Sequence, residues 1–149
     1  MDDRMRDLLA RLLDARGPSG FETEPGRVWR GEAEGFAHRV WADVHGNCFA
    51  ENDPGGAPRV MLAGHLDEIG LMINHVDEDG YLYVQAVGGW DPQVLVGQRV
   101  EILGRDGPVD GVVGRRAIHL IDRDERDKAV KIKDLWIDIG AGDREEAKE

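Results

Sequence analysis

The sequence contains a single cysteine, Cys48, and lacks any long run of apolar residues. One thiol cannot form an internal disulfide, and a zinc site built on two cysteine pairs is excluded. No stretch approaches the roughly 18 apolar residues that span a membrane, and the charged N-terminus has no unbroken apolar core like that of a signal peptide. We therefore expect a soluble cytoplasmic protein in which Cys48, inside an apolar stretch, is a small buried core residue.

Basic residues are also scarce. The chain has 19 lysines and arginines against 30 acidic residues, which gives a net charge of −11. Such a chain repels phosphate groups, which argues against nucleic acid as a partner, and most of these charges serve solubility. The residues that are present, with 41% hydrophobic content, 20 glycines and six prolines, predict a real core within a loop-rich, partly β structure.

The first part of the chain has a mixed pattern. Apolar residues at helical spacing predict an amphipathic helix over residues 2–16. A weaker helix is expected after Pro25, and strands at 39–44 and 48–51 form a hairpin. Residues 59–64 are nearly all apolar and predict a strand buried on both faces. The inward residues of the second helix are expected to be Val28, Trp29, Ala33 and Phe36.

The pattern changes near residue 68, where short strands separated by tight turns begin. Close spacing with little helix predicts a small all-β barrel or sandwich. The expected strands are 69–76, 81–87, 98–103, 109–113 and 135–139. The fold class is thus α/β followed by a small all-β domain.

The last residues, 143–149, predict an N-cap and the first turns of a helix, with Glu145 and Glu146 as a capping or solvated pair. A helix of about seven residues with no apolar stripe scarcely forms alone. The first part likewise offers a buried-type strand without enough strands for a covered sheet. Both features predict a larger protein cut short, whose α/β part exposes apolar surface and associates or dissolves poorly.

His65 and Asp67 follow the predicted strand at 59–64, at the strand end where active sites of open α/β sheets collect. Alternate residues of an extended chain point the same way, so the two side chains can cooperate. A neutral imidazole is a good zinc or cobalt ligand, and a nearby carboxylate can fix its tautomer. In a chain rich in aspartate, however, this spacing alone favours a structural role over a ligand role.

The wider stretch Val60–Met72 resembles the first metal-binding segment of the tetrahedral, or TET-type, aminopeptidases of metallopeptidase family forty-two, whose relatives include glutamyl aminopeptidases and proteins labelled endoglucanases. The likeness continues in order along nearly the whole chain. The matching segments are Pro18–Glu22, Asp43 with Gly46–Asn47, Val87–Asp91, Gly97–Val100, Ile118–Leu120 and Asp138–Ala141.

The resemblance implies a metal-dependent aminopeptidase that releases N-terminal residues from peptides with two divalent ions, zinc or cobalt. Residues 1–68 would be the N-terminal part of an α/β phosphorylase/hydrolase-like zinc-peptidase domain. Residues 69–141 would be a β-barrel-like insert used in dimerisation, with dimers building a dodecamer, and residues 142–149 the start of the returning catalytic domain. His65 would be a metal ligand, and Asp67 a catalytic-site residue that orients His65. The role of Glu68 stays open.

The remaining ligands and the general-base glutamate of the family follow its insert, and this sequence does not contain them. Catalytic zinc sites use about three protein ligands, so we expect the metals not to be held firmly and the chain alone to be inactive. The alternatives are a non-catalytic interaction or dimerisation module that pairs with a full-length or second-half subunit, and a degenerate remnant.

The other histidines have structural interpretations. His38 and His45 are expected to be exposed, His75 to be structural and His119 to be a hydrogen-bonded barrel residue. Trp90 is expected to pack inward, with a contact surface as the alternative.

Overall fold

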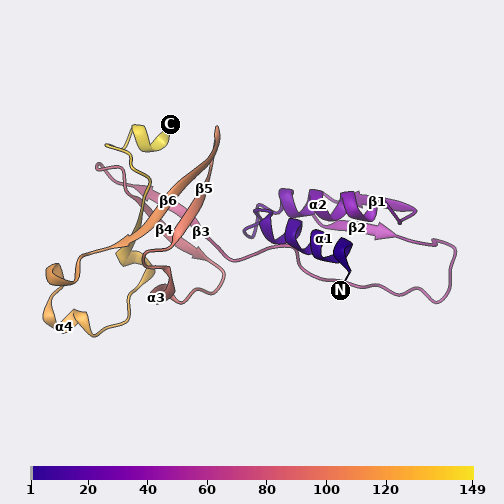
Figure 1. Cartoon of the computed structure of the whole chain (residues 1–149), viewed down its shortest axis with the longest axis horizontal. Helices are drawn as coiled ribbons and strands as arrows, with labels where there is room; N and C mark the ends of the chain where they lie inside the picture. Colours follow the sequence, from indigo (N-terminus) through magenta and orange to yellow (C-terminus); the bar gives the residue numbers. More distant parts are fainter. Residues whose placement is uncertain (1) are drawn as a thin grey trace. The chain divides into compact units, whose positions relative to one another are not determined.

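The structure is a computed structural model that describes residues 2–149. The chain forms two compact units, Met1–Glu68 and Ile69–Glu149, each of which is described by itself. Figure 1 shows helices and a short hairpin in the first unit and a larger sheet in the second. The roles predicted for residues 1–68, 69–141 and 142–149 remain predictions. The mixed α/β class is confirmed by the solved structures that this chain resembles.

The first unit begins with two helices, α1 (Asp3–Asp14) and α2 (Thr23–Ala33). Asp2 caps α1 by accepting a hydrogen bond from the Met5 amide at 2.8 Å, which satisfies one of the free donors of the first turn. Both predicted helices are confirmed, although α2 starts two residues before Pro25. Proline is tolerated there because the amides of a first helical turn have no partner within the helix.

Ion pairs join the two helices, and close packing at Gly26 holds α2 against the following hairpin. Glu32 on α2 accepts from Arg4 at 2.7 Å and from Arg11 at 2.8 Å, which joins α1 to α2. A Cβ at Gly26 would lie 3.2 Å from Sγ of Cys48, so glycine lets α2 approach the hairpin closely. Cys48 is therefore packed but half-buried, short of the fully buried position predicted for it.

The hairpin of the first unit consists of β1 (Arg39–Ala42) and β2 (Cys48–Glu51), paired antiparallel as predicted. Asp43 shapes its turn by accepting from the amides of His45 and Asn47 at 2.9 and 3.0 Å. A hydrogen bond from the Asn47 side chain is the main reason that the pKa of Asp43 lies below its ordinary value. Of the residues predicted to face inward on α2, Ala33 is buried, but Phe36 lies past the helix end and is 59% exposed.

The predicted strand at 59–64 is wrong. These residues are irregular and exposed, and the side chains of Val60, Met61 and Leu62 are 79%, 86% and 94% exposed. An apolar run forms a buried strand only when neighbouring strands pair with its backbone. Among residues 2–149 no strand pairs with this segment.

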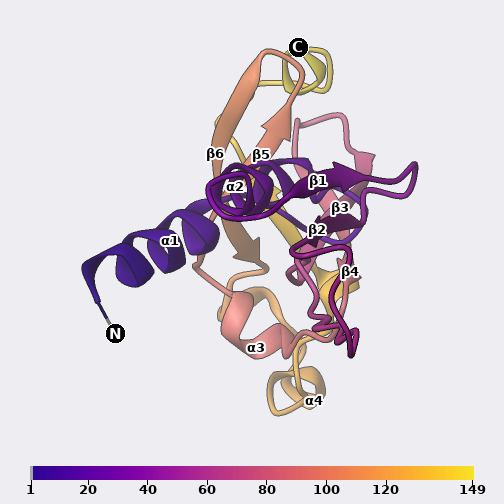
Figure 2. The ribbon, with the colours of Figure 1, turned by 90° about the vertical axis from the view of Figure 1, so that its right-hand side faces the viewer.

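The second unit is a five-stranded antiparallel sheet in the order β3-β4-β7-β6-β5. Figures 1 and 2 show β5 and β6 as a long hairpin that rises from the sheet. The five predicted strands are confirmed, but the sheet has two edge strands, β3 and β5, and a closed barrel is not confirmed. The strand bounds are β3 (Gly70–Val76), β4 (Leu82–Val87), β5 (Arg99–Gly104), β6 (Gly107–Arg115) and β7 (Leu135–Asp138).

Alternating side chains of the central strands form the core of this unit. Alternate residues at the start of β4 and along β7 are buried, as the twofold periodicity of a strand requires. Leu95 from the short helix α3 (Pro92–Leu95) closes the core, and Trp90 packs against it while its Nε1 donates to the Gly70 carbonyl at 2.8 Å. The packing role predicted for Trp90 is confirmed. The buried core residues are Leu82, Val84, Leu95, Val113, Leu135 and Ile137.

The connection from β6 to β7 contains only short helical turns: η1 (Ile118–Leu120), α4 (Arg123–Arg126) and η2 (Ile132–Asp134). His119 lies exposed in η1, outside the strands of the sheet, so the prediction of a hydrogen-bonded barrel residue is wrong. A tight turn forms here because Leu120 donates its amide to the Ala117 carbonyl at 2.8 Å and interrupts the apolar run.

The predicted C-terminal helix is limited to one turn, η3 (Glu146–Lys148). Asp143 caps it by accepting from the amides of Glu145 and Glu146, and the Glu146 carboxylate accepts from the Gly142 amide at 2.7 Å, which confirms its capping role. Among residues 2–149 no helix is long and apolar enough to cross a membrane.

Candidate metal-ligand site

The predicted pair His65 and Asp67 is brought together at the end of the exposed segment of the first unit. His65 Nδ1 lies 3.0 Å from Oδ1 of Asp67 and 3.0 Å from the Asp67 carbonyl oxygen. The His65 side chain is 86% exposed, whereas that of Asp67 is 38% exposed. Both acceptors face Nδ1, so this atom carries the proton in the neutral ring and Nε2 keeps its lone pair.

A second side chain contacts Asp67 from a distant part of the chain. The Ser19 hydroxyl donates to Oδ2 of Asp67 at 2.5 Å, so the two carboxylate oxygens have separate partners. This hydrogen bond is the main reason that the pKa of Asp67 lies below its ordinary value, and the bond to His65 adds to it. The carboxylate is thus held in its charged, accepting form.

Glu68 joins the same two segments through its backbone and its side chain. Its amide donates to the Gly17 carbonyl at 2.8 Å, its carbonyl accepts from the Ser19 amide at 3.2 Å, and its carboxylate accepts from the Gly17 amide at 3.0 Å. Pro18 and Glu68 form an isolated parallel bridge. The role of Glu68, left open by the sequence, is to fasten the turn at residues 17–19 to the site.

The pair by itself does not make a metal site. Among the described residues 2–149, no group of three or more histidine, cysteine, aspartate or glutamate side chains could hold a metal ion. His65 supplies one nitrogen, and Asp67 already serves Nδ1 and Ser19. About three protein ligands are needed to hold a catalytic zinc. The described residues by themselves therefore do not fit a resident ion.

The other histidines lie outside this corner. His38, His45 and His75 are exposed, as predicted for the first two. His38 Nδ1 lies 2.7 Å from the Asn52 Oδ1 atom and 3.1 Å from the Asp53 amide nitrogen, so the His38 ring contacts the chain at the end of the β1–β2 hairpin. The His75 ring lies 5.9 Å from that of Tyr83 across β3 and β4. These contacts support structural roles for His38 and His75.

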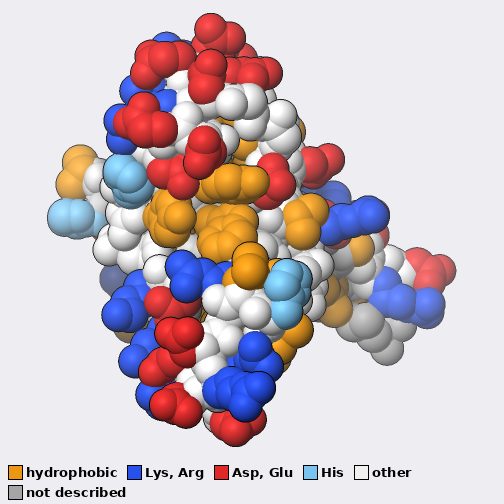
Figure 3. Space-filling model, turned by 90° about the vertical axis from the view of Figure 1, so that its left-hand side faces the viewer, with side chains coloured by type: hydrophobic (Ala, Val, Ile, Leu, Met, Phe, Trp, Pro, Cys, Tyr) orange, Lys and Arg blue, Asp and Glu red, His pale blue; other side chains and the backbone are white. Residues whose placement is uncertain are grey.

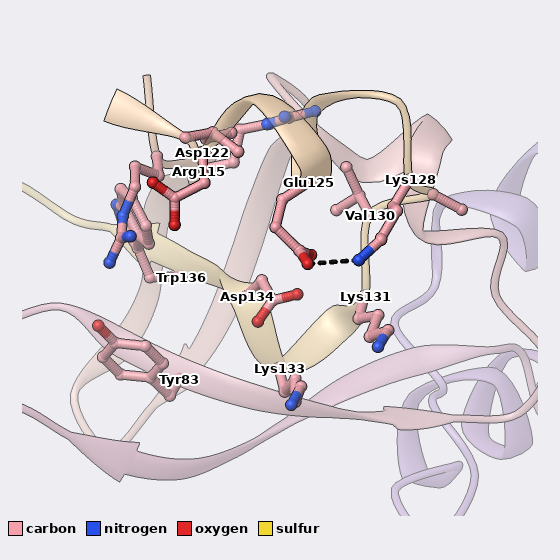
Figure 4. Close-up of a pocket in the computed structure, with 13 residues that line it drawn as sticks. Tyr83, Arg115, Asp122, Glu125, Lys128, Val130, Lys131, Lys133, Asp134 and Trp136 are labelled. Carbon is pink, nitrogen blue, oxygen red and sulfur yellow. Dashed lines mark hydrogen bonds and ion pairs between the residues drawn. The ribbon is translucent and has the colours of Figure 1, made fainter. Parts of the chain in front are cut away.

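The second unit contains a cavity of about 390 Å³, where Tyr83 on β4 and Trp136 on β7 face the connection from β6 (Figure 4). Burial is the main reason that the pKa of Tyr83 is raised, so its hydroxyl stays neutral. Lys128 pairs with Glu125 at 2.5 Å, and the charged residues of the lining carry both signs, so their charge does not single out one class of ligand. The charged residues of the lining are Arg115, Arg116, Asp122, Glu125, Lys128, Lys131, Lys133 and Asp134.

Apolar side chains also reach the surface of the second unit. Figure 3 shows hydrophobic side chains gathered in the middle of one face, with acidic side chains above them and mixed charges below. Several apolar residues of this unit are about half exposed, among them Val94 on α3, Leu103 on β5 and Val112 on β6. This unit therefore combines a complete core with a partly apolar surface.

Comparison with known proteins gives one consistent result. Residues 46–149 match the model of the family described as M42 glutamyl aminopeptidase. The chain is 38% identical to lysyl aminopeptidase of Pyrococcus furiosus over 146 residues, which cover 96% of this chain and 42% of that protein. The chain thus spans about two fifths of the length of this relative.

Solved structures show the same likeness. The crystal structure of the TET aminopeptidase from Thaumarchaeota archaeon SCGC AB-539-E09 matches with a TM-score of 0.92 and 38% identity, over 98% of this chain and 41% of that one. The TET1 peptidase of Pyrococcus horikoshii, which can assemble into a tetrahedron or a large octahedral shell, matches with a TM-score of 0.83 and 35% identity, over 96% and 42% of the two chains. Nearly the whole described fold therefore lies within that of its relatives.

Proposed function

The chain belongs to the M42 glutamyl aminopeptidase family. From that premise we propose that it is part of a metal-dependent aminopeptidase that releases N-terminal residues from peptides. In this proposal His65 is one ligand of a two-metal centre of zinc or cobalt, and Asp67 orients it. The 149 residues by themselves are inactive, because the other ligands and the general base are not among them. Peptides are the substrates.

One observation carries this proposal: the paired acceptors at Nδ1 of His65. They leave Nε2, which makes no hydrogen bond within residues 2–149, as the only ring atom free to bind a ligand. Ligating histidines commonly bond their other ring nitrogen to a carboxylate or carbonyl in this way. A merely structural histidine at the surface would have no need for a carboxylate that is itself held by a third residue.

The proposal extends to assembly. The second unit would be an insert that makes dimer contacts, and the partners would be further copies of the complete subunit. Its support is the partly apolar face of that unit and the shells that the TET1 relative can form. The exposed apolar segment Val60–Leu62 of the first unit would be covered by residues that complete the α/β sheet.

Complementation tests the catalytic proposal. The 149-residue chain is mixed with the segment of the Pyrococcus furiosus lysyl aminopeptidase that follows its matching part, and release of amino acids from short peptides is measured with zinc or cobalt. We expect turnover only from the mixture, and loss of it with His65→Ala. A mixture that associates and binds metal but leaves peptides intact, whether or not the chain carries His65→Ala, would contradict the catalytic proposal.

The second candidate function is a non-catalytic interaction or dimerisation module that pairs with a full-length or second-half subunit. The core of the second unit favours it, because the buried residues and those packed against them all belong to that unit. Under this alternative, association in the same mixture persists in His65→Ala chains and no peptide is cleaved. Under the catalytic proposal, association persists as well, but cleavage depends on His65.

A further inference from the structure

Ser19 and Asp67 are 48 residues apart in the sequence, yet their side chains share the shortest hydrogen bond of the site, 2.5 Å. Other hydrogen bonds of the local fold hold these two segments together. The turn that carries Ser19 is fastened to Glu68 by two backbone hydrogen bonds and by the bond from the Gly17 amide to the Glu68 carboxylate. These hydrogen bonds therefore place the Ser19 hydroxyl next to the Asp67 carboxylate.

We propose that Ser19 is a positioning residue of this site: it holds the Asp67 carboxylate in the rotamer that keeps the His65 proton on Nδ1 and Nε2 open for a ligand. Glu68 holds Ser19 within hydrogen-bonding distance of Asp67. The proposal deepens the proposed aminopeptidase function and rests on it for the purpose of the open Nε2. The hydrogen-bond chain itself does not depend on that function.

The physical need for Ser19 follows from the exposure of the pair. The His65 ring is 86% exposed, and no packing fixes its orientation. An aspartate with one free oxygen can rotate about its side-chain bonds and exchange its partner for water. With Ser19 on Oδ2, rotation of the carboxylate would break two hydrogen bonds instead of one, so the oxygen facing His65 keeps its place.

The sequence around Ser19 is suited to this task. A Cβ at Gly17 would lie 2.6 Å from Cγ of Pro25, so the chain passes α2 at a distance that only glycine allows. Gly20 has a φ of +93°, which turns the chain away directly after Ser19. The Phe21 amide closes this turn by donating to the Pro18 carbonyl at 2.8 Å. Ser19 is thus presented at the tip of a rigid turn.

The test measures the tautomer of His65 and requires neither metal nor turnover. In the 149-residue chain labelled with ¹⁵N-histidine, long-range ¹H–¹⁵N spectra at a pH where the rings are neutral give the ratio of the Nδ1–H to the Nε2–H form. We expect Nδ1–H to dominate at His65. Ser19→Ala should lower the ratio roughly threefold to tenfold, the effect of about one hydrogen bond, and Ser19→Thr should restore most of it.

Controls separate positioning from folding. The Ser19→Ala chain keeps the Ser19 backbone bonds, so amide shifts of α2 and of the second unit should stay unchanged, and His38 serves as an internal reference ring. Asp67→Asn should change the ratio at least as much as Ser19→Ala. An unchanged ratio in a folded Ser19→Ala chain, or loss of the ratio with no rescue by threonine, would overturn the role of Ser19. Failure of the complementation assay would leave this result intact, so the two proposals fail separately.

Discussion

The two units of the molecule differ in how well they bury their own apolar residues. The second unit encloses six buried aliphatic side chains from β4, β6, β7 and α3. In the described residues of the first unit only Ala15 and Ala33 are buried hydrophobic residues, while Val60, Met61 and Leu62 are almost fully exposed. The unit with the candidate site is therefore the one with the poorer core.

This difference has a structural basis in the segment that leads to His65. An α/β site lies at the ends of neighbouring strands, and each strand adds ligands as well as burial. The segment that leads to His65 has the apolar composition of a central strand but no strand beside it among residues 2–149. The exposure of this segment therefore follows from the lack of a neighbouring strand among the described residues.

Leu135→Ala should have the largest effect on the stability of the second unit. Leu135 is fully buried at 0% exposure, and its truncation should lower the free energy of unfolding of the second unit by about 2–5 kcal/mol. Urea unfolding followed by near-ultraviolet circular dichroism measures the loss. The matched control is Leu62→Ala, at 94% exposure, for which we expect a change within about 0.5 kcal/mol. A large loss at Leu62 would show that its segment is packed.

Gly17→Ala and Gly31→Ala form a second pair, both within the first unit. A Cβ at position 17 would lie 2.6 Å from Pro25, and we expect a cost of about 1–3 kcal/mol. Position 31 lies inside α2 with nothing within 4 Å, so alanine there should stabilise the helix by up to about 1 kcal/mol. Hydrogen exchange of the α2 amides measures both changes. Equal signs for the two variants would contradict the packing described at Gly17.

Polar substitution of the exposed segment tests the apolar surface of the first unit. In a chain with Val60→Ser, Met61→Ser and Leu62→Ser, we expect self-association and the fluorescence of a bound hydrophobic dye to fall several-fold, because less apolar area is exposed. Light scattering and dye titration measure this. Leu103→Ser, at a half-exposed position of the second unit, is the control. A larger effect at Leu103 would place the association surface on the second unit.

The smallest effect is expected from acid at the α1–α2 contact. Hydrogen bonds from Arg4 and then Arg11 lower the pKa of Glu32 below its ordinary 4.5. A depressed pKa contributes stability that is present above the unfolded value and is lost as the pH falls through the folded value. Protection of the α1 amides should therefore decrease below about pH 4.5, and Glu32→Gln should remove this pH dependence. If the loss of α1 amide protection at low pH is unchanged in Glu32→Gln, groups other than Glu32 cause it.

The sequence predicted the second unit better than the first, for a physical reason. Alternation in Leu82–Val87 and Leu135–Asp138 reports a sheet whose strands are all in the chain. The apolar run at 59–64 carries the same kind of signal, but burial depends on neighbours that composition cannot supply. His119 failed similarly, because an apolar run does not reveal the 3₁₀ turn that Leu120 closes.

Spacing together with family likeness predicts the pair His65 and Asp67, but it does not predict the contact from Ser19 to Asp67. The pair His65 and Asp67 is local, so two residues of sequence are enough to suggest it. Ser19 contacts Asp67 only because a turn at residues 17–19 folds back onto Glu68, a contact across some 50 positions. The family-like segment Pro18–Glu22 was the only signal of its importance, and no periodicity links it to residue 67.

The most direct test of this account is the peptide turnover of the purified 149-residue chain alone, measured with zinc or cobalt and compared with its His65→Ala variant. Because no group of three or more metal-ligating side chains is found among the described residues, we predict no turnover from either chain above that of the metal in buffer. Metal-dependent turnover by the original chain that disappears in His65→Ala would contradict the account, since a working site would then lie within these residues.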